Sequence, residues 1–115
     1  VVLYLGRTYE ALGDMNYASS LYKSYLEKNP DDVGICNQLG LCQLENGDYE
    51  GALASFEKGL EVTESGMRQS LLYNQIVAYE YMADFQKAAV LMENYLNSYP
   101  DDDTARREYE FLKTR

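Results

Sequence analysis

Few side chains in this sequence could carry out catalysis or hold a metal ion. The chain has no histidine, so the Ser–His and Cys–His pairs that activate a nucleophile cannot form. Its two cysteines, Cys36 and Cys42, are six residues apart. On one helix they would point about 240° apart, which rules out a disulfide between them, and without a histidine they cannot complete a zinc site. We therefore expect two buried thiols, no cofactor, no metal and no enzymatic activity.

A run of acidic residues, Asp101 to Asp103, is a second candidate for ion binding. A calcium loop counted from Asp101 would need a glycine at position 6 and a glutamate at position 12, where the sequence has Arg106 and Leu112. Negative charge instead stabilises the N-terminus of a helix, because the helix dipole is positive there. The sequence therefore predicts that these aspartates begin a C-terminal helix.

Tyrosine is unusually frequent, with 12 copies and no tryptophan. A tyrosine can bury its ring and keep its hydroxyl near water, which suits a shallow helical core. We expect most tyrosines, among them Tyr9, Tyr22 and Tyr95, to be core residues. Tyrosines that stay exposed in a groove would be candidates for binding a partner, because binding hot spots favour this side chain.

The net charge of -9 over 115 residues restricts the classes of partner. Such an acidic surface repels phosphate backbones and anionic lipids, so we expect no nucleic acid partner. No apolar run approaches the ~18 residues of a membrane span, so we expect no membrane insertion. The first residue is not a methionine, which indicates a piece of a longer protein. Unpaired cysteines favour a reducing compartment such as the cytoplasm, with an exported or lipid-anchored parent as the alternative.

Three stretches of the sequence align with each other as a turn followed by an alanine. The alanines are Ala18, Ala52 and Ala88, and the steps between them are 34 and 36 residues. Apolar residues recur at helical spacing before and after each turn. The first and third units end at Pro30 and Pro100, and proline terminates a helix. This period and pattern indicate helix–turn–helix units.

These units resemble the tetratricopeptide repeat family. The residues that carry the resemblance are Leu5, Gly6, Tyr9, Ala18, Tyr22 and Pro30 in the first unit, Leu39, Gly40, Ala52 and Phe56 in the second, and Tyr79, Ala88 and Pro100 in the third. The second unit departs from the family pattern at Gln43 and lacks a closing proline. The third unit has Gln75 and Ile76 in place of Leu-Gly.

The resemblance implies an all-α fold, a right-handed superhelical stack of three hairpins followed by a capping helix. We expect a single domain over 1–115. Its parts are repeats near 1–32, 33–66 and 67–102 and a capping helix near 103–115, with Ala105, Tyr109 and Leu112 on the buried face of that helix.

Small residues should set the geometry of the hairpins. Gly6 and Gly40 are expected to face Ala18 and Ala52, so that paired helices approach closely. Gly13 and Gly47 should supply a positive φ at the turns, whereas Ala83 has less conformational freedom at the matching place. Because Ile76 fills the slot of the glycine, we expect the third hairpin to be wider than the first two. Two extra residues around 63–66 should lengthen the connection to it.

The resemblance also implies a binding face, because the first helix of each unit lines the concave surface in this family. The positions that point there are Leu3, Arg7 and Glu10, then Asn37, Leu41 and Leu44, then Tyr73, Val77, Glu80 and Tyr81. We take Arg7, Asn37, Leu41, Leu44, Tyr73, Val77 and Tyr81 as the candidate partner-binding residues. The alternative for Leu41, Leu44 and Val77 is packing against a neighbouring repeat.

The groove composition favours an apolar and aromatic partner segment. A subset of the family clamps a peptide carboxylate with Lys and Asn, but only Arg7 is cationic here and only Asn37 matches a clamp asparagine. We therefore do not expect a carboxylate-clamp chaperone adaptor. The hypothesis is a scaffold that binds a partner protein or peptide. The alternatives are a spacer, self-association through the N-terminal edge of the stack, or an accessory domain of a multidomain protein.

Overall fold

The computed structural model describes residues 2–62 and 66–115, and the described residues form helices and turns without a strand. The seven helices are α1 (Val2–Ala11), α2 (Met15–Lys28), α3 (Val33–Glu45), α4 (Tyr49–Leu60), α5 (Arg68–Tyr81), α6 (Phe85–Ser98) and α7 (Asp103–Leu112). The all-α superhelical fold expected from the sequence is confirmed. No helix in the described part of the chain has both the length and the apolar content needed to cross a bilayer.

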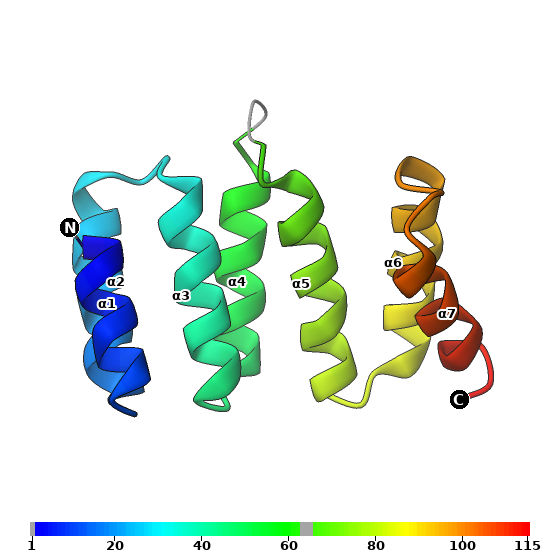
Figure 1. Ribbon diagram of the computed structural model, residues 1–115, viewed down its shortest axis with the longest axis horizontal. Coiled ribbons are helices and arrows are strands. Elements are labelled where there is room, and N and C mark those ends of the chain that lie inside the picture. The colour runs from blue at the N-terminus through cyan, green and yellow to red at the C-terminus, as the bar shows by residue number, and fades with distance from the viewer. Residues whose placement is uncertain (1, 63–65) are drawn as a thin grey trace.

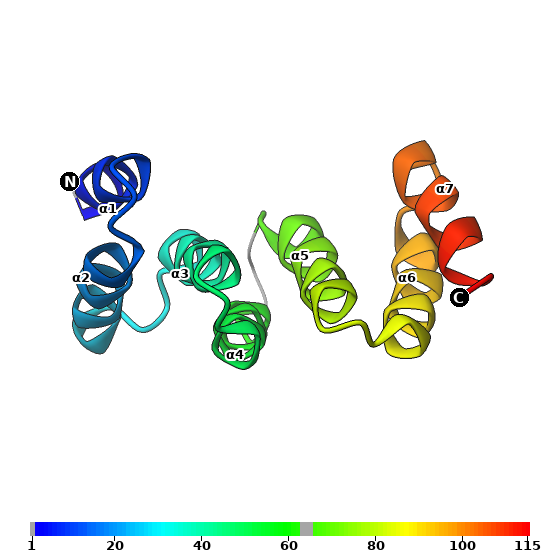
Figure 2. The same cartoon turned by 90° about the horizontal axis from the view of Figure 1, so that it is seen from below.

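The helices stand side by side in a row from α1 to α7, with the two ends of the chain at opposite ends of the row (Figure 1). Viewed along the helices, α1, α3 and α5 lie on one side and α2, α4 and α6 on the other (Figure 2). The row is curved, and α1 and α7 bend toward the side of the first helices. This curvature makes the side formed by α1, α3 and α5 the concave face.

Aspartates begin most of the helices. The carboxylates of Asp14, Asp32, Asp48, Asp84 and Asp102 each accept a hydrogen bond from the backbone N–H three residues later, at the start of α2, α3, α4, α6 and α7. An aspartate is among the best N-cap residues, because it satisfies an amide that has no partner within the helix. The interpretation of the aspartate run at 101–103 as a helix start is therefore confirmed, with Asp102 as the cap.

Buried side chains join each second helix to the helices on both sides of it. Three clusters form this core: Ala18, Tyr22, Leu26, Ile35, Cys36, Leu39 and Cys42; then Leu44, Ala52, Leu53, Phe56, Leu71 and Ala78; then Ile76, Ala88, Met92, Tyr95, Ala105 and Leu112. Tyr22 and Tyr95 are core residues, as predicted, whereas Tyr9 is only partly buried. The burial of Ala105 and Leu112 shows that α7 covers the end of the stack.

The glycines of the first helices pack against aromatic rings. A Cβ added to Gly6 would lie 2.2 Å from the Tyr22 ring, and one added to Gly40 would lie 2.3 Å from the Phe56 ring. The expectation that these glycines face Ala18 and Ala52 therefore needs correction, because the nearest atoms belong to the rings. Each glycine makes room for an aromatic side chain that fills the space between the two helices of the hairpin.

The third hairpin fills the same space differently. At the same spacing of 16 residues it has Ile76 and Met92, which are 1% and 0% exposed. Helices α5 and α6 stand further apart than α3 and α4 in both views (Figures 1 and 2), in line with the larger residue at the glycine slot. The expected lengthening of the connection around 63–66 involves residues 63–65, which lie outside the described residues.

The three hairpin turns share a left-handed residue. Gly13 and Gly47 have φ values of 85° and 83°, and Ala83 has a φ of 60° at the matching position. An L-residue other than glycine pays a steric cost in this region. The third turn therefore has the same left-handed conformation as the first two, at some cost in backbone strain.

Both cysteines are buried and unpaired. Cys36 is 1% exposed and Cys42 is 0% exposed, which confirms the expectation of two buried thiols. Cys42 lies 3.3 Å from the Ser19 hydroxyl, and its Sγ donates to the backbone oxygen of Met15. Burial raises the pKa of both thiols, so they are small core residues with little thiolate character.

Candidate functional site

An open hollow lies between the second and third hairpins. It has a volume of about 560 Å³ and opens to solvent. Its lining comes from four helices and comprises Asn37 and Leu41 of α3, Gln69, Ser70, Tyr73 and Asn74 of α5, Tyr95 of α6, and Asp102 and Thr104 at the start of α7. We call this hollow the α3–α5 pocket. The stacking of hairpins, rather than any single helix, creates it.

The α3–α5 pocket brings together three of the seven candidate binding residues, Asn37, Leu41 and Tyr73. Leu41 and Tyr73 are partly buried and keep some surface, whereas Asn37 is only 8% exposed. Leu41 also packs against the second core cluster. The Leu41 side chain therefore does both things that were considered for it: it lines the pocket, and it packs against the neighbouring repeat.

The other four candidates lie elsewhere. Leu44 is 5% exposed and belongs to the second core cluster, against which Val77 also packs, so packing describes both side chains. Tyr81 is 57% exposed and meets the Tyr49 ring edge-on, with centroids 5.8 Å apart. Arg7 lines a separate hollow on α1. The structure thus does not gather the seven residues into one continuous surface.

Two asparagines in the lining of the α3–α5 pocket are hydrogen-bonded to each other. Nδ2 of Asn74 donates to Oδ1 of Asn37 over 2.8 Å. This bond joins α5 to α3 and satisfies part of the hydrogen-bonding capacity of the nearly buried Asn37 amide. Asn37 was a predicted site residue, but Asn74 was not, although it directly follows Tyr73 in the sequence. Helical spacing alone could not select it, because its role depends on where α3 lies.

A second polar chain links the pocket to the start of α7. Nε2 of Gln69 donates to the Tyr95 hydroxyl over 3.0 Å, and that hydroxyl donates to Oδ2 of Asp102 over 2.6 Å. The hydrogen bond from Tyr95, followed by that from the Ala105 amide, holds the pKa of Asp102 below its usual range. The carboxylate is therefore charged at neutral pH.

A third polar cluster lies behind Tyr73. The Tyr73 hydroxyl of α5 donates to Oε2 of Glu108 in α7. Burial, followed by the nearby charge of Glu108, raises the pKa of Glu80 to about 7, and Oε1 of Glu80 is buried without a hydrogen-bond partner. Burial and these carboxylates, together with Asp102, raise the pKa of Tyr73. Three acidic groups, Glu80, Glu108 and Asp102, thus act on the hydroxyl of Tyr73, a residue of the pocket lining.

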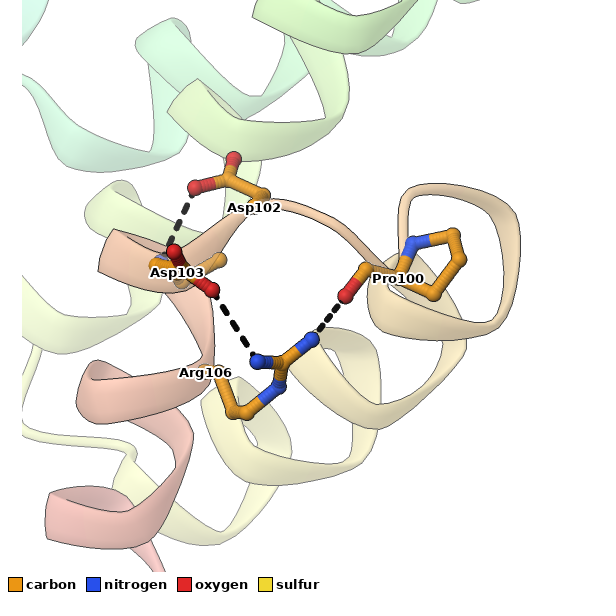
Figure 3. Close-up of polar contacts among 5 residues, drawn as sticks. Pro100, Asp102, Asp103 and Arg106 are labelled. Atoms are coloured by element: carbon orange, nitrogen blue, oxygen red, sulfur yellow. Dashed lines mark hydrogen bonds and ion pairs between the residues drawn. The ribbon is translucent and has the colours of Figure 1, made fainter.

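Asp102, in the loop from α6 to α7 (Figure 3), is one of the residues that line the pocket. Oδ1 of Asp102 caps α7 by accepting from the Ala105 amide over 3.1 Å. The guanidinium of Arg106 lies between Asp103, 3.0 Å away, and the backbone oxygen of Pro100. Figure 3 shows this guanidinium away from the Asp102 carboxylate. The sequence predicted a helix start here but contained no signal that it would also line a pocket.

Family comparisons agree with this repeated architecture. One tetratricopeptide repeat model matches residues 21–54, and a second matches residues 1–32 and 70–102, which together make up more than half of the chain. The chain belongs to the tetratricopeptide repeat family. Repeats of this family are typically non-catalytic modules for protein interaction.

A curated relative contains a similar stretch. Residues of this tetratricopeptide repeat chain are 40% identical over 50 positions to the BBSome complex member bbs-4 of Caenorhabditis elegans. The match covers 44% of this chain and 11% of that protein. The matched stretch therefore spans about a tenth of the length of that relative, and the similarity concerns one part of a much larger protein.

Solved tetratricopeptide repeat structures superpose on nearly the whole chain. The second such domain of human RPAP3, in complex with an HSP70 peptide, has a TM-score of 0.83 at 15% identity and covers 99% of this chain and 93% of that one. A tetratricopeptide repeat protein from Parabacteroides merdae has a TM-score of 0.80 at 20% identity, covering 96% of this chain and 43% of its own. At these identities the likeness establishes the fold.

Proposed function

We propose that this tetratricopeptide repeat chain is a protein-interaction scaffold that holds a segment of a partner protein in the α3–α5 pocket. The observation that carries the proposal is the pocket itself, which lies on the concave side and contains Asn37, Leu41 and Tyr73. It combines apolar and aromatic surface with amide and hydroxyl groups. Such a mixture suits recognition of an extended or helical segment that inserts side chains between helices.

Two structural neighbours support a peptide ligand of some kind. One is the second repeat domain of human RPAP3 in complex with an HSP70 peptide, and the other is the first repeat domain of Spaghetti (RPAP3) bound to an HSP90 peptide. Both peptides, SGPTIEEVD and SRMEEVD, are acidic. The lining of the α3–α5 pocket has a carboxylate, Asp102, and no lysine or arginine. This chain therefore suits a different peptide from those two, in keeping with the argument against a carboxylate clamp.

Affinity capture from a lysate with matched variants tests the proposal. The double variant Leu41→Glu/Tyr73→Ala should lose a partner that the wild type enriches, because a charge and a cavity replace the apolar wall of the pocket. Val90→Glu is the control, because it adds a charge at a residue that is 55% exposed on α6 and does not line the pocket. Circular dichroism should remain helical in both variants.

Hydrogen exchange then places the partner on the surface. Binding should slow exchange of the amides in 69–74, a segment that contributes Gln69, Ser70, Tyr73 and Asn74 to the pocket lining. A partner that the double variant still binds as tightly as the wild type, with no slowing in this segment, would rule out the α3–α5 pocket as the binding site.

Self-association through α1 is the second candidate function. Helix α1 exposes Leu3, Tyr4 and Leu5 to 38%, 77% and 42%, and Leu3 and Tyr4 line a hollow of about 510 Å³ with Arg7, Thr8 and Ala11. An exposed apolar patch of this kind favours contact with another protein surface. Sedimentation analysis of wild type and Tyr4→Ser over a range of concentrations tests this, and a monomer throughout would exclude it.

A further inference from the structure

We infer that the partner segment held in the α3–α5 pocket carries a lysine or arginine, whose cationic head group lies beside Asp102 and the rings of Tyr73 and Tyr95. The inference rests on the proposed function, since it specifies the chemistry of the segment that the same pocket receives. It is argued from the charge of the pocket, from the direction of its hydrogen bonds and from the position of the neighbouring cations of α7.

The pocket lining carries negative charge and no positive charge. Among its lining residues Asp102 is a carboxylate with a lowered pKa, and none is a lysine or arginine. Glu108 accepts a hydrogen bond from the Tyr73 hydroxyl, and Glu108, Glu80 and Asp102 all raise the pKa of that hydroxyl. A cation beside Tyr73 gains from the Asp102 carboxylate of the lining and from the two glutamates that act on the Tyr73 hydroxyl, and partial burial weakens screening by salt.

The cations of α7 and of the residues after it have no described contact with the Asp102 carboxylate. Arg106 lies beside Asp103 and the backbone oxygen of Pro100, on the side of the loop away from Asp102 (Figure 3). Lys113 pairs with Glu110 over 3.2 Å, and Arg115 lies over the Phe111 ring. Arg107 is exposed and makes no described contact with the acidic groups. The negative charge of the pocket is therefore left without a cationic partner from the described residues.

The hydrogen bonds of the lining leave two amide oxygens without a described donor. Tyr73 and Tyr95 both use their hydroxyl protons on carboxylates. Gln69 and Asn74 donate through their amide nitrogens, so no described bond occupies the amide oxygen of either. An ammonium group has three donors and a guanidinium five, and neither has an acceptor. The lining thus offers the complement of a lysine or arginine head group.

The two tyrosine rings add a second attraction. They meet edge-on with centroids 5.8 Å apart, and both line the pocket. A cation within about 6 Å of an aromatic ring centroid is attracted by the negative face of the ring. The alkyl stem of a lysine or arginine can lie along Leu41 while its head group reaches the rings, as long cationic side chains do on apolar surfaces.

The same geometry makes binding depend on pH. Glu80, with a pKa raised to about 7, is largely protonated at pH 6. A bound cation favours the charged form of Glu80 over the neutral form, so it binds more tightly once Glu80 has ionised. Glu108 of α7 faces Glu80, and Tyr95, Asp102 and Glu108 face Tyr73 from α6 and from the start and middle of α7. Affinity should therefore rise from pH 6 to pH 8.

Selection from a random displayed peptide library tests the inference in vitro with the 115-residue chain. Peptides that bind the wild type and not Leu41→Glu/Tyr73→Ala are the pocket-dependent set. We expect this set to share a lysine or arginine at one position. In synthetic copies, replacing that lysine with norleucine, or that arginine with citrulline, should weaken binding about tenfold, the effect of one charge-assisted contact.

Matched protein variants locate the acceptor. Asp102→Asn keeps an N-cap residue, because asparagine caps as well as aspartate, and it should weaken the same peptides about tenfold. Asp103→Asn removes the same charge one residue away and outside the pocket, and it should change affinity less than twofold.

The outcomes separate the two proposals. Pocket-dependent peptides without a shared cation would overturn this inference and leave the proposed function standing. An equal effect of Asp102→Asn and Asp103→Asn would also overturn it, since attraction to the overall acidic charge would then explain binding. A library that yields no pocket-dependent peptide would overturn the proposed function and the inference with it.

Discussion

Gly40 of α3 lies directly against the ring of Phe56 in α4, so that a Cβ on Gly40 would come within 2.3 Å of that ring. Gly6 and Tyr22 repeat the arrangement in the first hairpin at 2.2 Å. Phe56 and Tyr22 are both fully buried, so neither ring has space to move away. The glycine of one helix and the aromatic residue of the other therefore determine how close the two helices lie.

Replacing Gly40 with alanine should destabilise the protein. Alanine favours the helix by about 1 kcal/mol, but the added methyl group would overlap the Phe56 ring and force the hairpin apart. We expect a net loss of about 1–3 kcal/mol in the free energy of unfolding, the usual cost of overpacking a core. Urea denaturation followed by circular dichroism measures this change.

Gly34→Ala is the control for Gly40→Ala. It lies in the same helix, and its added Cβ would make only ordinary contacts, at 3.6 Å from Asp32 and 3.8 Å from Met67. It should be neutral or stabilising by up to about 1 kcal/mol. If Gly40→Ala proved as stable as Gly34→Ala, the close contact with Phe56 would not limit the spacing of α3 and α4.

Ala83→Gly should stabilise the third turn. Ala83 has a φ of 60°, in the left-handed region where an L-residue is strained. Glycine relieves this strain, and we expect a gain of about 1 kcal/mol in the free energy of unfolding. The converse change Gly47→Ala, at a φ of 83° with no atom within 4 Å of the added Cβ, should lose a similar amount. Thermal unfolding of both variants checks the sign.

Stability should fall between about pH 4.5 and pH 7 because of Glu80. Its pKa rises from 4.5 to about 7 in the folded protein, so the native state binds more protons than the unfolded state in this interval. The stabilisation is complete below the unfolded pKa and is lost as the pH rises through the folded pKa. One proton corresponds to a slope of at most about 1.4 kcal/mol per pH unit, reduced here because the Glu80–Glu108 pair is partly exposed.

Glu80→Gln checks this pH dependence. The amide cannot ionise, so the difference in stability between the variant and the wild type should grow from pH 5 to pH 7.5 in favour of the variant. Glu27→Gln, at an exposed residue of α2, serves as the comparison and should leave the wild-type profile unchanged. A constant difference for Glu80→Gln across this range would show that Glu80 ionises normally.

Both thiols should resist modification in the folded state. Cys36 and Cys42 are 1% and 0% exposed, and burial raises the pKa of each. A thiol reagent at pH 7 should therefore label neither cysteine at a measurable rate until the chain unfolds. Mass spectrometry before and after addition of urea counts the modified residues. Rapid labelling of the native protein would show that the cores around α3 open easily.

The sequence predicted the helices well because each is specified by short-range signals. Aspartates at 14, 48, 84 and 102 cap the helices that follow them, and proline or a left-handed residue ends the preceding ones. The repeat of Ala18, Ala52 and Ala88 then indicates the hairpin unit, and all three alanines are fully buried. These signals act within a few residues, so they can be read without the tertiary structure.

The candidate site was predicted only in part, because it depends on distance between helices rather than spacing along one. Periodicity placed Asn37, Leu41 and Tyr73 on the concave side, and the structure brings them into one pocket. The same periodicity also selected Leu44, which the neighbouring repeat buries. The direction of a side chain does not reveal what covers it.

By itself, the sequence determined the all-α class, the repeating hairpin, the start of the last helix and the acidic character, since all of these follow from local residue types and their period. The tertiary structure alone decided that Asp102 closes one side of a pocket and that Glu108 comes to Tyr73, 35 residues away. Both contacts depend on the angle at which α7 packs on the last hairpin. That angle results from the summed packing of Ile76, Met92 and their neighbours, and no motif in the sequence encodes it.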